Sequence, residues 1–182
     1  NNDTIVALVT TAGDTAGTMS VADQIDGGAG TDTLSVTLTN SALAAASTPV
    51  ASAVEIVTLR ALSNETAYFS LANMGTGVTA INISGSSDIN VAGLSNGSKV
   101  AFSGNYAKTA TLAIGTNSTA DTITLTMNDV NSADVIANDY ETVNLVANTT
   151  AAFINGEAFS IGTAQTLNVS GSANVVLNLA LP

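Results

Sequence analysis

Three glycines and one aspartate near the start of the sequence have the spacing of a metal-binding turn. They lie in residues 27–35, GGAGTDTLS, which fit the pattern G-G-x-G-x-D-x-U-x, with U an apolar residue, at every fixed position. Calcium takes about six to eight oxygen ligands, so backbone carbonyls must supplement the carboxylates. The glycines permit the positive φ angles of a tight turn that directs carbonyls inward. The pattern therefore predicts a calcium site to which Asp32 adds a charged oxygen.

This turn needs further ligands, because one nonapeptide cannot fill the coordination sphere of calcium. Asp23 lies nine residues before Asp32, so 18–26 is interpreted as a degenerate preceding repeat without its glycines. We therefore expect a calcium-binding turn over 18–35. Its candidate metal-binding residues are Asp23, Asp26, Gly27, Gly28, Gly30 and Asp32. The alternative is an ordinary glycine-rich turn with solvated aspartates.

The sequence also contains an internal duplication. At an offset of 86 residues, 54–59 falls on 140–145 and, without a gap, 80–91 falls on 166–177. Self-similarity of this kind is typical of repeat architectures, in which neighbouring units stack on one another.

The duplication extends to the region of the candidate calcium site. Residues 32–38 fall on 121–127 at an offset of 89, so the connecting loop differs in length. The second copy keeps the aspartate, as Asp121, but has no glycine in this frame, and the prediction of calcium therefore applies to the first copy. We expect two related β modules, 1–112 and 113–182.

Apolar and polar residues alternate along much of the chain, which is typical of β-strands that bury one face. The alternation occupies residues 34–38, 81–83, 89–91, 123–127, 143–145, 167–169 and 175–177. Together with the duplication it predicts an all-β fold, a parallel β-helix or β-solenoid with a short calcium-binding turn. Two β-sandwich modules in tandem are the alternative. The apolar segment 175–181 is expected to offer a strand that can pair with a neighbouring molecule.

A few segments depart from the strand pattern. The pairs Asn96-Gly97 and Asn155-Gly156 predict tight turns. Residues 41–53 are rich in alanine and predict a helix, interrupted by Pro49, and 130–138 occupy the corresponding place in the second copy and predict a short helical turn.

Composition excludes several classes of function. The 182 residues include 14 acidic and three basic side chains, and the formal net charge of −11 repels nucleic acid phosphates and anionic lipids. The longest apolar stretch is too short to span a bilayer. We therefore expect no nucleic-acid partner and no membrane insertion. Bound calcium would stabilise such a chain by neutralising carboxylates.

The missing residue types exclude further chemistry. There is no Cys, His or Trp, which removes thiolate nucleophiles, His-dependent triads and the usual zinc ligands. Without disulfides, the stability of the chain outside the cell would depend on packing or on bound calcium. The chain begins at Asn1 rather than at an initiator methionine, as expected of a processed or excised segment.

Residues 23–34 (DQIDGGAGTDTL), followed by a Glu-x-Val-x-Leu strand from Glu55 and by 81–86 (INISGS), resemble the RTX-type bacterial surface-layer proteins exported by type I secretion. The resemblance implies a calcium-dependent β-solenoid that folds outside the cell and assembles into a lattice or fibre. It also implies an extracellular location at the bacterial cell surface, with copies of itself as partners and cell-surface polysaccharide as a further candidate partner. The chain departs from a full RTX array in having one intact nonapeptide.

A structural, self-assembling extracellular module is the favoured function, because the tandem repeat is combined with few catalytic residue types. A carbohydrate-binding or adhesin module of a type I secreted protein is an alternative. Aromatic rings that could stack on sugars, or pack in the core instead, are those of Tyr68, Phe69, Tyr106 and Tyr140.

The other alternative is an enzyme that cleaves glycans with paired carboxylates. The acidic residues that lie close together in sequence are Asp129, Asp134, Asp139 and Glu141. A solvated acidic loop accounts for the same residues. We therefore expect that the chain is not an enzyme.

Overall fold

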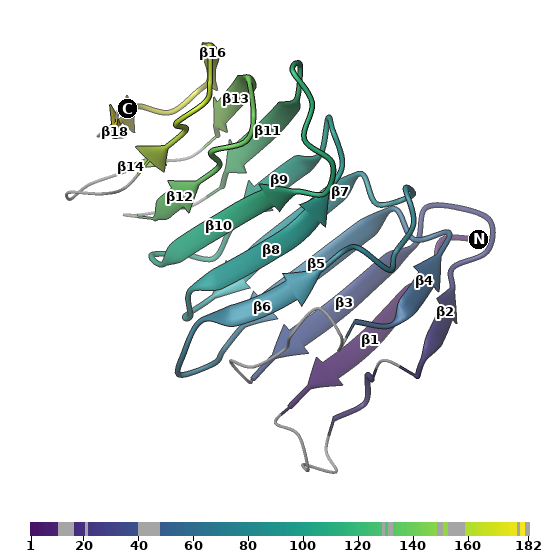
Figure 1. Ribbon diagram of the computed structural model, residues 1–182. Coiled ribbons are helices and arrows are strands. Elements are labelled where there is room, and N and C mark those ends of the chain that lie inside the picture. Colours follow the sequence, from purple (N-terminus) through teal and green to yellow (C-terminus); the bar gives the residue numbers. More distant parts are fainter. Residues whose placement is uncertain are drawn as a thin grey trace.

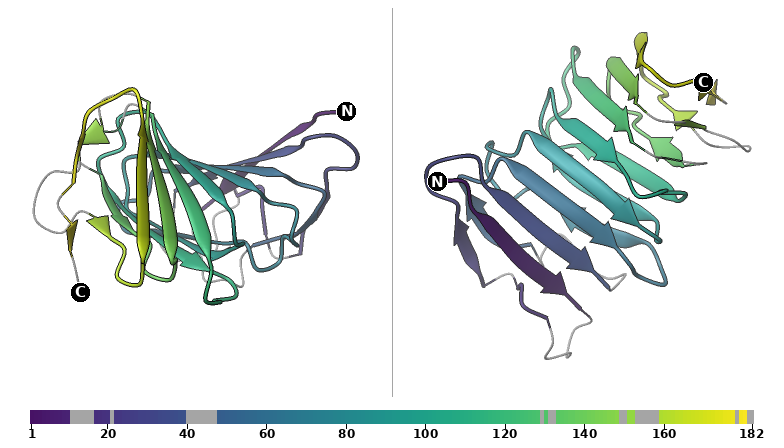
Figure 2. Two further views of the ribbon diagram at one scale, coloured as in Figure 1. Left: turned by 90° about the horizontal axis from the view of Figure 1, so that it is seen from above. Right: turned by 180° about the vertical axis from the view of Figure 1, so that it is seen from behind.

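The computed structural model describes residues 1–10, 17–20, 22–39, 48–128, 130, 133–148, 151–152, 159–177 and 179–180. Over these residues the chain forms β-strands and no helix, and the strands stack into a solenoid with the two termini at opposite ends (Figures 1 and 2). Every strand pairing in it is parallel, which confirms the predicted parallel β-solenoid and excludes tandem antiparallel sandwiches.

The larger sheet has eight strands. In order across the sheet they are β1 (Thr4–Val9), β3 (Thr33–Leu38), β5 (Ile56–Ala61), β7 (Ala80–Gly85), β9 (Lys99–Phe102), β11 (Thr122–Met127), β13 (Thr142–Ala147) and β16 (Thr166–Gly171). One winding of the chain, here called a coil, separates each strand from the next, so that Thr33 lies beside Ile56 and Ile56 beside Ala80. Parallel neighbours require such a crossover.

The remaining strands form the other walls of the coils. A six-stranded sheet contains β6 (Ala67–Ser70), β8 (Ile89–Leu94), β10 (Thr109–Ile114), β12 (Asp134–Ile136), β15 (Phe159–Ser160) and β18 (Leu179–Ala180). Two short pairs complete the set, β2 (Gln24–Asp26) with β4 (Val50–Ser52) and β14 (Ala151–Ala152) with β17 (Val175–Val176).

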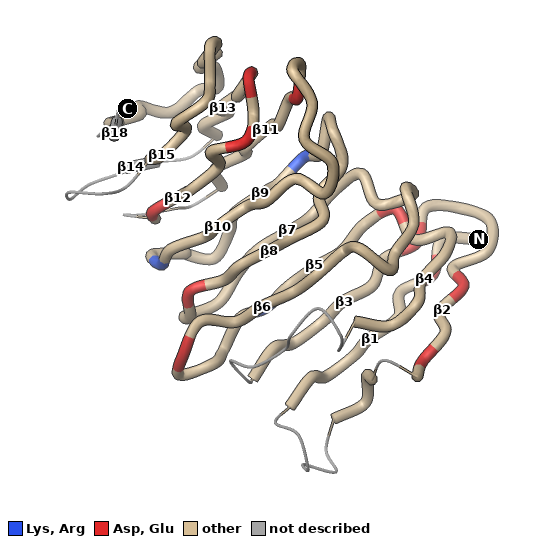
Figure 3. The backbone as a smooth tube through the Cα atoms, in the orientation of Figure 1, with Lys and Arg blue, Asp and Glu red and all other residues tan. Residues whose placement is uncertain are grey.

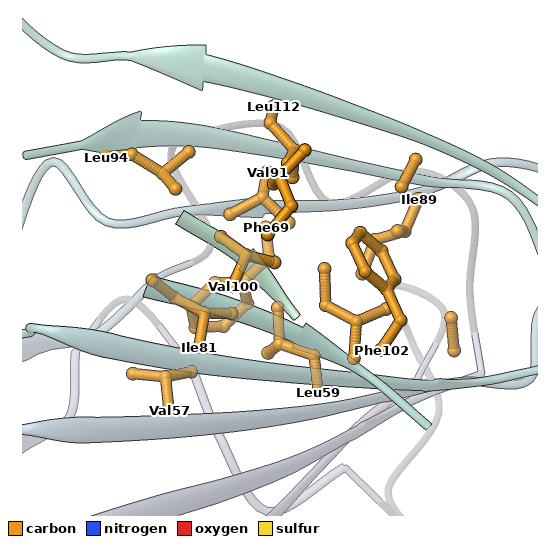
Figure 4. Packing of buried hydrophobic residues seen from close by; sticks show 14 of the residues in the cluster. Val57, Leu59, Phe69, Ile81, Ile89, Val91, Leu94, Val100, Phe102 and Leu112 are labelled. Carbon is orange, nitrogen blue, oxygen red and sulfur yellow. The ribbon is translucent and has the colours of Figure 1, made fainter. Parts of the chain in front are cut away.

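The hydrophobic core lies between the two main sheets. Every second side chain of β3 is buried, at Leu34, Val36 and Leu38, because successive side chains of a strand point to opposite faces. The side chains that meet across the core include Val57, Leu59, Ile81, Val100 and Phe102 on one side and Phe69, Ile89, Val91, Leu94 and Leu112 on the other (Figure 4). Each such buried side chain contributes roughly 1.5–3 kcal/mol to stability.

The internal duplication corresponds to a shift of four strands along the larger sheet. β11, β13 and β16 lie four places after β3, β5 and β7, their equivalents in the first copy. The larger sheet is continuous across residue 112, since β9 pairs with β11. The division into modules 1–112 and 113–182 stays a prediction.

Both predicted helices are wrong where the structure describes them. Residues 50–52, in the second half of the first, form β4, and residues 134–136 of the second form β12. Parallel neighbours explain the difference: β4 pairs with β2, and β12 pairs with β10 and β15, so pairing with strands of other coils overrides the local prediction of helix. Residues 41–47 lie outside the described part of the chain.

Two further expectations concern turns and the last strands. The turn at Asn96-Gly97 is confirmed, with a φ of 81° at Gly97, and it joins β8 to β9, which belong to different sheets. Asn155-Gly156 lies outside the described residues. In the segment 175–181, β17 and β18 pair with β14 and β15 of the same chain, and β18 is an edge strand of the six-stranded sheet. That this segment offers a strand to a neighbouring molecule stays a prediction. The C-terminal edge strand of the larger sheet is β16.

Candidate metal centre

The glycines of the candidate calcium-binding turn connect β2 to β3. Gly28 and Gly30 have positive φ angles of 82° and 139°, as the tight turn requires. Gly27 is needed for a different reason, because a Cβ there would lie 1.9 Å from the carbonyl oxygen of Ala53 and 2.8 Å from Cβ of Asp32. Close packing against the next coil therefore explains part of the glycine pattern without a metal ion.

Asp32 is fully buried at the end of this turn, immediately before β3. Its Oδ1 accepts a hydrogen bond of 2.6 Å from the backbone N–H of Asp3, and its own N–H donates to Oε2 of Glu55 at 2.8 Å. Its Oδ2 is buried and has no hydrogen-bond partner. An unpartnered buried carboxylate oxygen is costly, so this is the atom that a cation at the turn would satisfy.

The equivalent aspartate of the second copy, Asp121, is also buried but has partners for both oxygens. Oδ1 accepts from the hydroxyl of Ser118 at 2.8 Å, and Oδ2 accepts from the Ser118 N–H. Its backbone N–H donates to Oε2 of Glu141 at 2.7 Å, as Asp32 does to Glu55. Ala29 stands where the second copy has Ser118, so the first copy lacks this hydroxyl.

Glu55 and Glu141 are site residues that the motif did not identify. Each accepts the N–H of the buried aspartate in the preceding coil, and they occupy equivalent positions of the duplication. The recurrence of an Asp and a Glu in both copies is the sequence signal that could have revealed this contact.

Both proposed helper ligands already accept hydrogen bonds from nearby groups. Oδ2 of Asp23 accepts from the Ser20 N–H at 2.6 Å, and Oδ1 of Asp26 accepts from the Gly28 N–H at 3.1 Å and from the Ser52 hydroxyl at 3.3 Å. The described residues contain no group of three or more Asp, Glu, His or Cys that could hold a metal ion. The turn therefore offers one buried carboxylate oxygen to calcium, and a site built from all six predicted residues stays a prediction.

The candidate sugar-stacking rings are mostly in the core. Phe69, Tyr106 and Tyr140 are fully buried, as the alternative of core packing predicted. Burial raises the pKa of Tyr106, with a contribution from Asp88, and burial followed by Asp139 and Asp121 raises the pKa of Tyr140. These phenols are unavailable to a ligand at the surface.

The acidic residues considered for catalysis do not form a described cluster. Glu141 is used by the N–H of Asp121, Asp134 belongs to β12, and Asp129 lies outside the described residues. Most acidic residues lie in turns and at the ends of strands (Figure 3). An open hollow of about 510 Å³ is lined only by uncharged residues, among them Gly75, Gly93 and Gly115, and offers no acid or base.

The fold defines the chain as a parallel β-solenoid protein with a candidate metal-binding turn near its first coils. No family model, no curated protein and no solved structure matches this chain. Within its described residues, no helix has the length and hydropathy needed to cross a membrane.

Proposed function

We propose that the chain is a structural module that self-assembles outside the cell, in a bacterial surface layer or fibre, and that it folds and assembles with calcium. The observation that carries the proposal is the buried Oδ2 of Asp32 in the glycine turn, which has no hydrogen-bond partner and which a bound cation would satisfy. The stack of coils, in which each coil contacts only its neighbours, is a repeat architecture and supports a structural role.

The proposed calcium site is built on Asp32. Oδ2 of Asp32 would hold the ion, and carbonyl oxygens of the glycine turn would supplement it, with Asp23 and Asp26 as candidate helpers. The ion would supply positive charge to a chain of net charge −11 and a partner for a buried oxygen that has none. The proposed partners are copies of the same chain, with cell-surface polysaccharide as a further candidate.

The proposal is tested by comparing the chain in calcium and in EGTA. Circular dichroism, the melting temperature and the particle size should all change on removal of calcium. At free calcium a hundredfold above its dissociation constant, binding adds about 2.7 kcal/mol, or roughly 5–10 °C in Tm for a chain of this length. Magnesium at the same concentration is the control, because it demands a tighter octahedral geometry. The same spectrum, Tm and particle size in EGTA would contradict the proposal.

A further inference from the structure

The turn before β11 is closed by hydrogen bonds within its own residues, 118–121 (STAD). The N–H and the hydroxyl of Ser118 both donate to the carboxylate of Asp121. The Ala120 N–H donates in turn to the Ser118 hydroxyl at 3.4 Å. Asp121 is buried, and these bonds give each of its carboxylate oxygens a partner. We call this arrangement the closed turn.

A closed turn also forms before β2, in residues 20–23 (SVAD). The Ser20 N–H donates to Oδ2 of Asp23 at 2.6 Å, and the Ala22 N–H donates to the Ser20 hydroxyl at 3.2 Å. The two closed turns lead into different sheets, since β2 pairs with β4 and β11 belongs to the larger sheet. What they share is a serine three positions before the aspartate and an alanine directly before it. The hydrogen bonds therefore follow from this local sequence rather than from the place in the fold.

The glycine turn before β3 differs at the same positions. Residues 29–32 read AGTD, so Ala29 stands in the place of the serine and supplies no hydroxyl. Oδ1 of Asp32 accepts from the Asp3 N–H of another coil, and Oδ2 is buried without a partner. This turn, here called the open turn, therefore leaves unpartnered an oxygen of the kind that the closed turn satisfies internally.

Gly30 sets the backbone form of the open turn. Its φ is 139°, a conformation that residues with a Cβ rarely adopt, and a Cβ there would lie 2.3 Å from the Asn1 carbonyl oxygen. Its equivalent in the second copy is Thr119, a β-branched residue, for which a positive φ is strongly disfavoured. This glycine and the alanine before it thus separate the open turn from the closed one.

A buried carboxylate oxygen can gain a partner in two ways. Without one, it carries a desolvation cost that a hydrogen bond or a cation removes. In the closed turn, hydrogen bonds from Ser118 supply the partner. In the open turn, bound calcium would supply it, with carbonyl oxygens as further ligands of the ion. A turn that is already closed therefore gains little from calcium.

We propose that the residues at positions 29 and 30 determine whether this turn depends on calcium. Ala29 and Gly30 keep the turn open, with Oδ2 of Asp32 available to the ion. A serine and a β-branched residue in their place, as at Ser118 and Thr119, close the turn and make the ion unnecessary. The inference rests on the proposed calcium site at Asp32 and adds the residues that control it.

Exchanging the turn sequences between the two copies tests this control. The first variant gives residues 29–32 the sequence STAD through Ala29→Ser, Gly30→Thr and Thr31→Ala. Its Tm in EGTA should match or exceed that of the parent chain, and the rise in Tm on addition of calcium should disappear. Thr31→Ala alone is the matched control, which keeps Ala29 and Gly30 and should keep the full calcium response. A first variant that responds to calcium as the parent chain does would overturn the inference and leave the calcium site standing.

The reverse exchange decides the question if the first variant fails to fold. It gives residues 117–121 the sequence GAGTD, in a chain that also carries Asp32→Asn, through Asn117→Gly, Ser118→Ala, Thr119→Gly and Ala120→Thr. Asp32→Asn alone should show no calcium response, and the exchange should restore a calcium-dependent rise in Tm at Asp121. The absence of a restored response would overturn the inference. A parent chain whose Tm is unaffected by calcium would contradict the proposed calcium site itself.

Discussion

At the residue scale, the two buried aspartates occupy the same fold position with different hydrogen-bond partners. Asp32 and Asp121 both precede a core strand and both donate their N–H to a glutamate of the next coil. Ser118 completes the hydrogen bonds of Asp121, whereas Oδ2 of Asp32 has no partner. The first copy is therefore the one in which the proposed calcium would have a buried oxygen to bind.

Substitution of each aspartate by asparagine separates the two roles. Asp32→Asn keeps an oxygen for the Asp3 N–H and removes the charge, so we expect nearly unchanged stability in EGTA and loss of the calcium-dependent rise in Tm. Asp121→Asn, the matched control, should lose about 1–3 kcal/mol in both conditions and keep the response to calcium. Thermal melts with and without calcium measure both. An unchanged calcium response in Asp32→Asn would remove this residue from the site.

The raised pKa values of two buried tyrosines predict a loss of stability at alkaline pH. The pKa values of Tyr106 and Tyr140 are raised in the folded chain, so their contribution is fully present below the unfolded pKa of about 10 and is lost as the pH rises through the folded values. Urea denaturation between pH 8 and about 11 should show this fall. In a Tyr106→Phe, Tyr140→Phe double variant, the free energy of unfolding should fall less steeply with pH. Equal slopes in the variant and the parent chain would contradict the assignment of the fall to these tyrosines.

At the element scale, glycines at the ends of strands let successive coils pack closely. Gly85, the last residue of β7, has a φ of 121°, and a Cβ there would lie 2.0 Å from the Ala61 carbonyl oxygen. Its equivalent Gly171 has a φ of 112° and would meet Ala147 at 2.1 Å. The same backbone geometry is therefore repeated in both copies.

Alanine substitutions at two glycines separate the cost of a backbone clash between coils from the cost of a positive φ angle. Gly85→Ala should destabilise the chain by about 3 kcal/mol or more, because it adds a backbone clash to the strain of positive φ. Gly97→Ala, at a φ of 81° with no atom within 4 Å of the added Cβ, should cost about 1 kcal/mol. Chemical denaturation of both variants measures the difference, and equal losses would show that close approach at Gly85 is unimportant.

The sequence predicted the strands well because alternation has the period of a strand. The positions of Leu34, Val36 and Leu38, or of Ile81 and Ile83, identify their buried faces without knowledge of the partner strands. Residues 50–52 and 134–136 were missed because alternation is absent there and their strand form depends on neighbouring coils. The local propensity of a segment carries no information about its hydrogen bonds to a strand in another coil.

Only the local part of the candidate site could be predicted from the sequence. Asp32 followed from a local motif, since the turn and its aspartate lie within nine residues. The contact of Asp32 with Glu55 joins two coils and has no local signal. The burial that leaves Oδ2 without a partner likewise depends on stacking and could be seen only in the folded chain.

At the scale of the whole molecule, the solenoid has two unlike ends. Residues 1–32 contain five aspartates and no basic side chain, whereas residues 158–182 contain no Asp, Glu, Lys or Arg. A stack of coils contacts only its neighbours, so each coil depends for its stability on the coils beside it.

Self-assembly of the chain can be measured by sedimentation velocity over a range of protein concentrations in calcium. We expect a sedimentation coefficient that rises with concentration from that of the 18.0 kDa monomer to that of a dimer or larger assembly. A monomer at every concentration, in calcium as in EGTA, would contradict it.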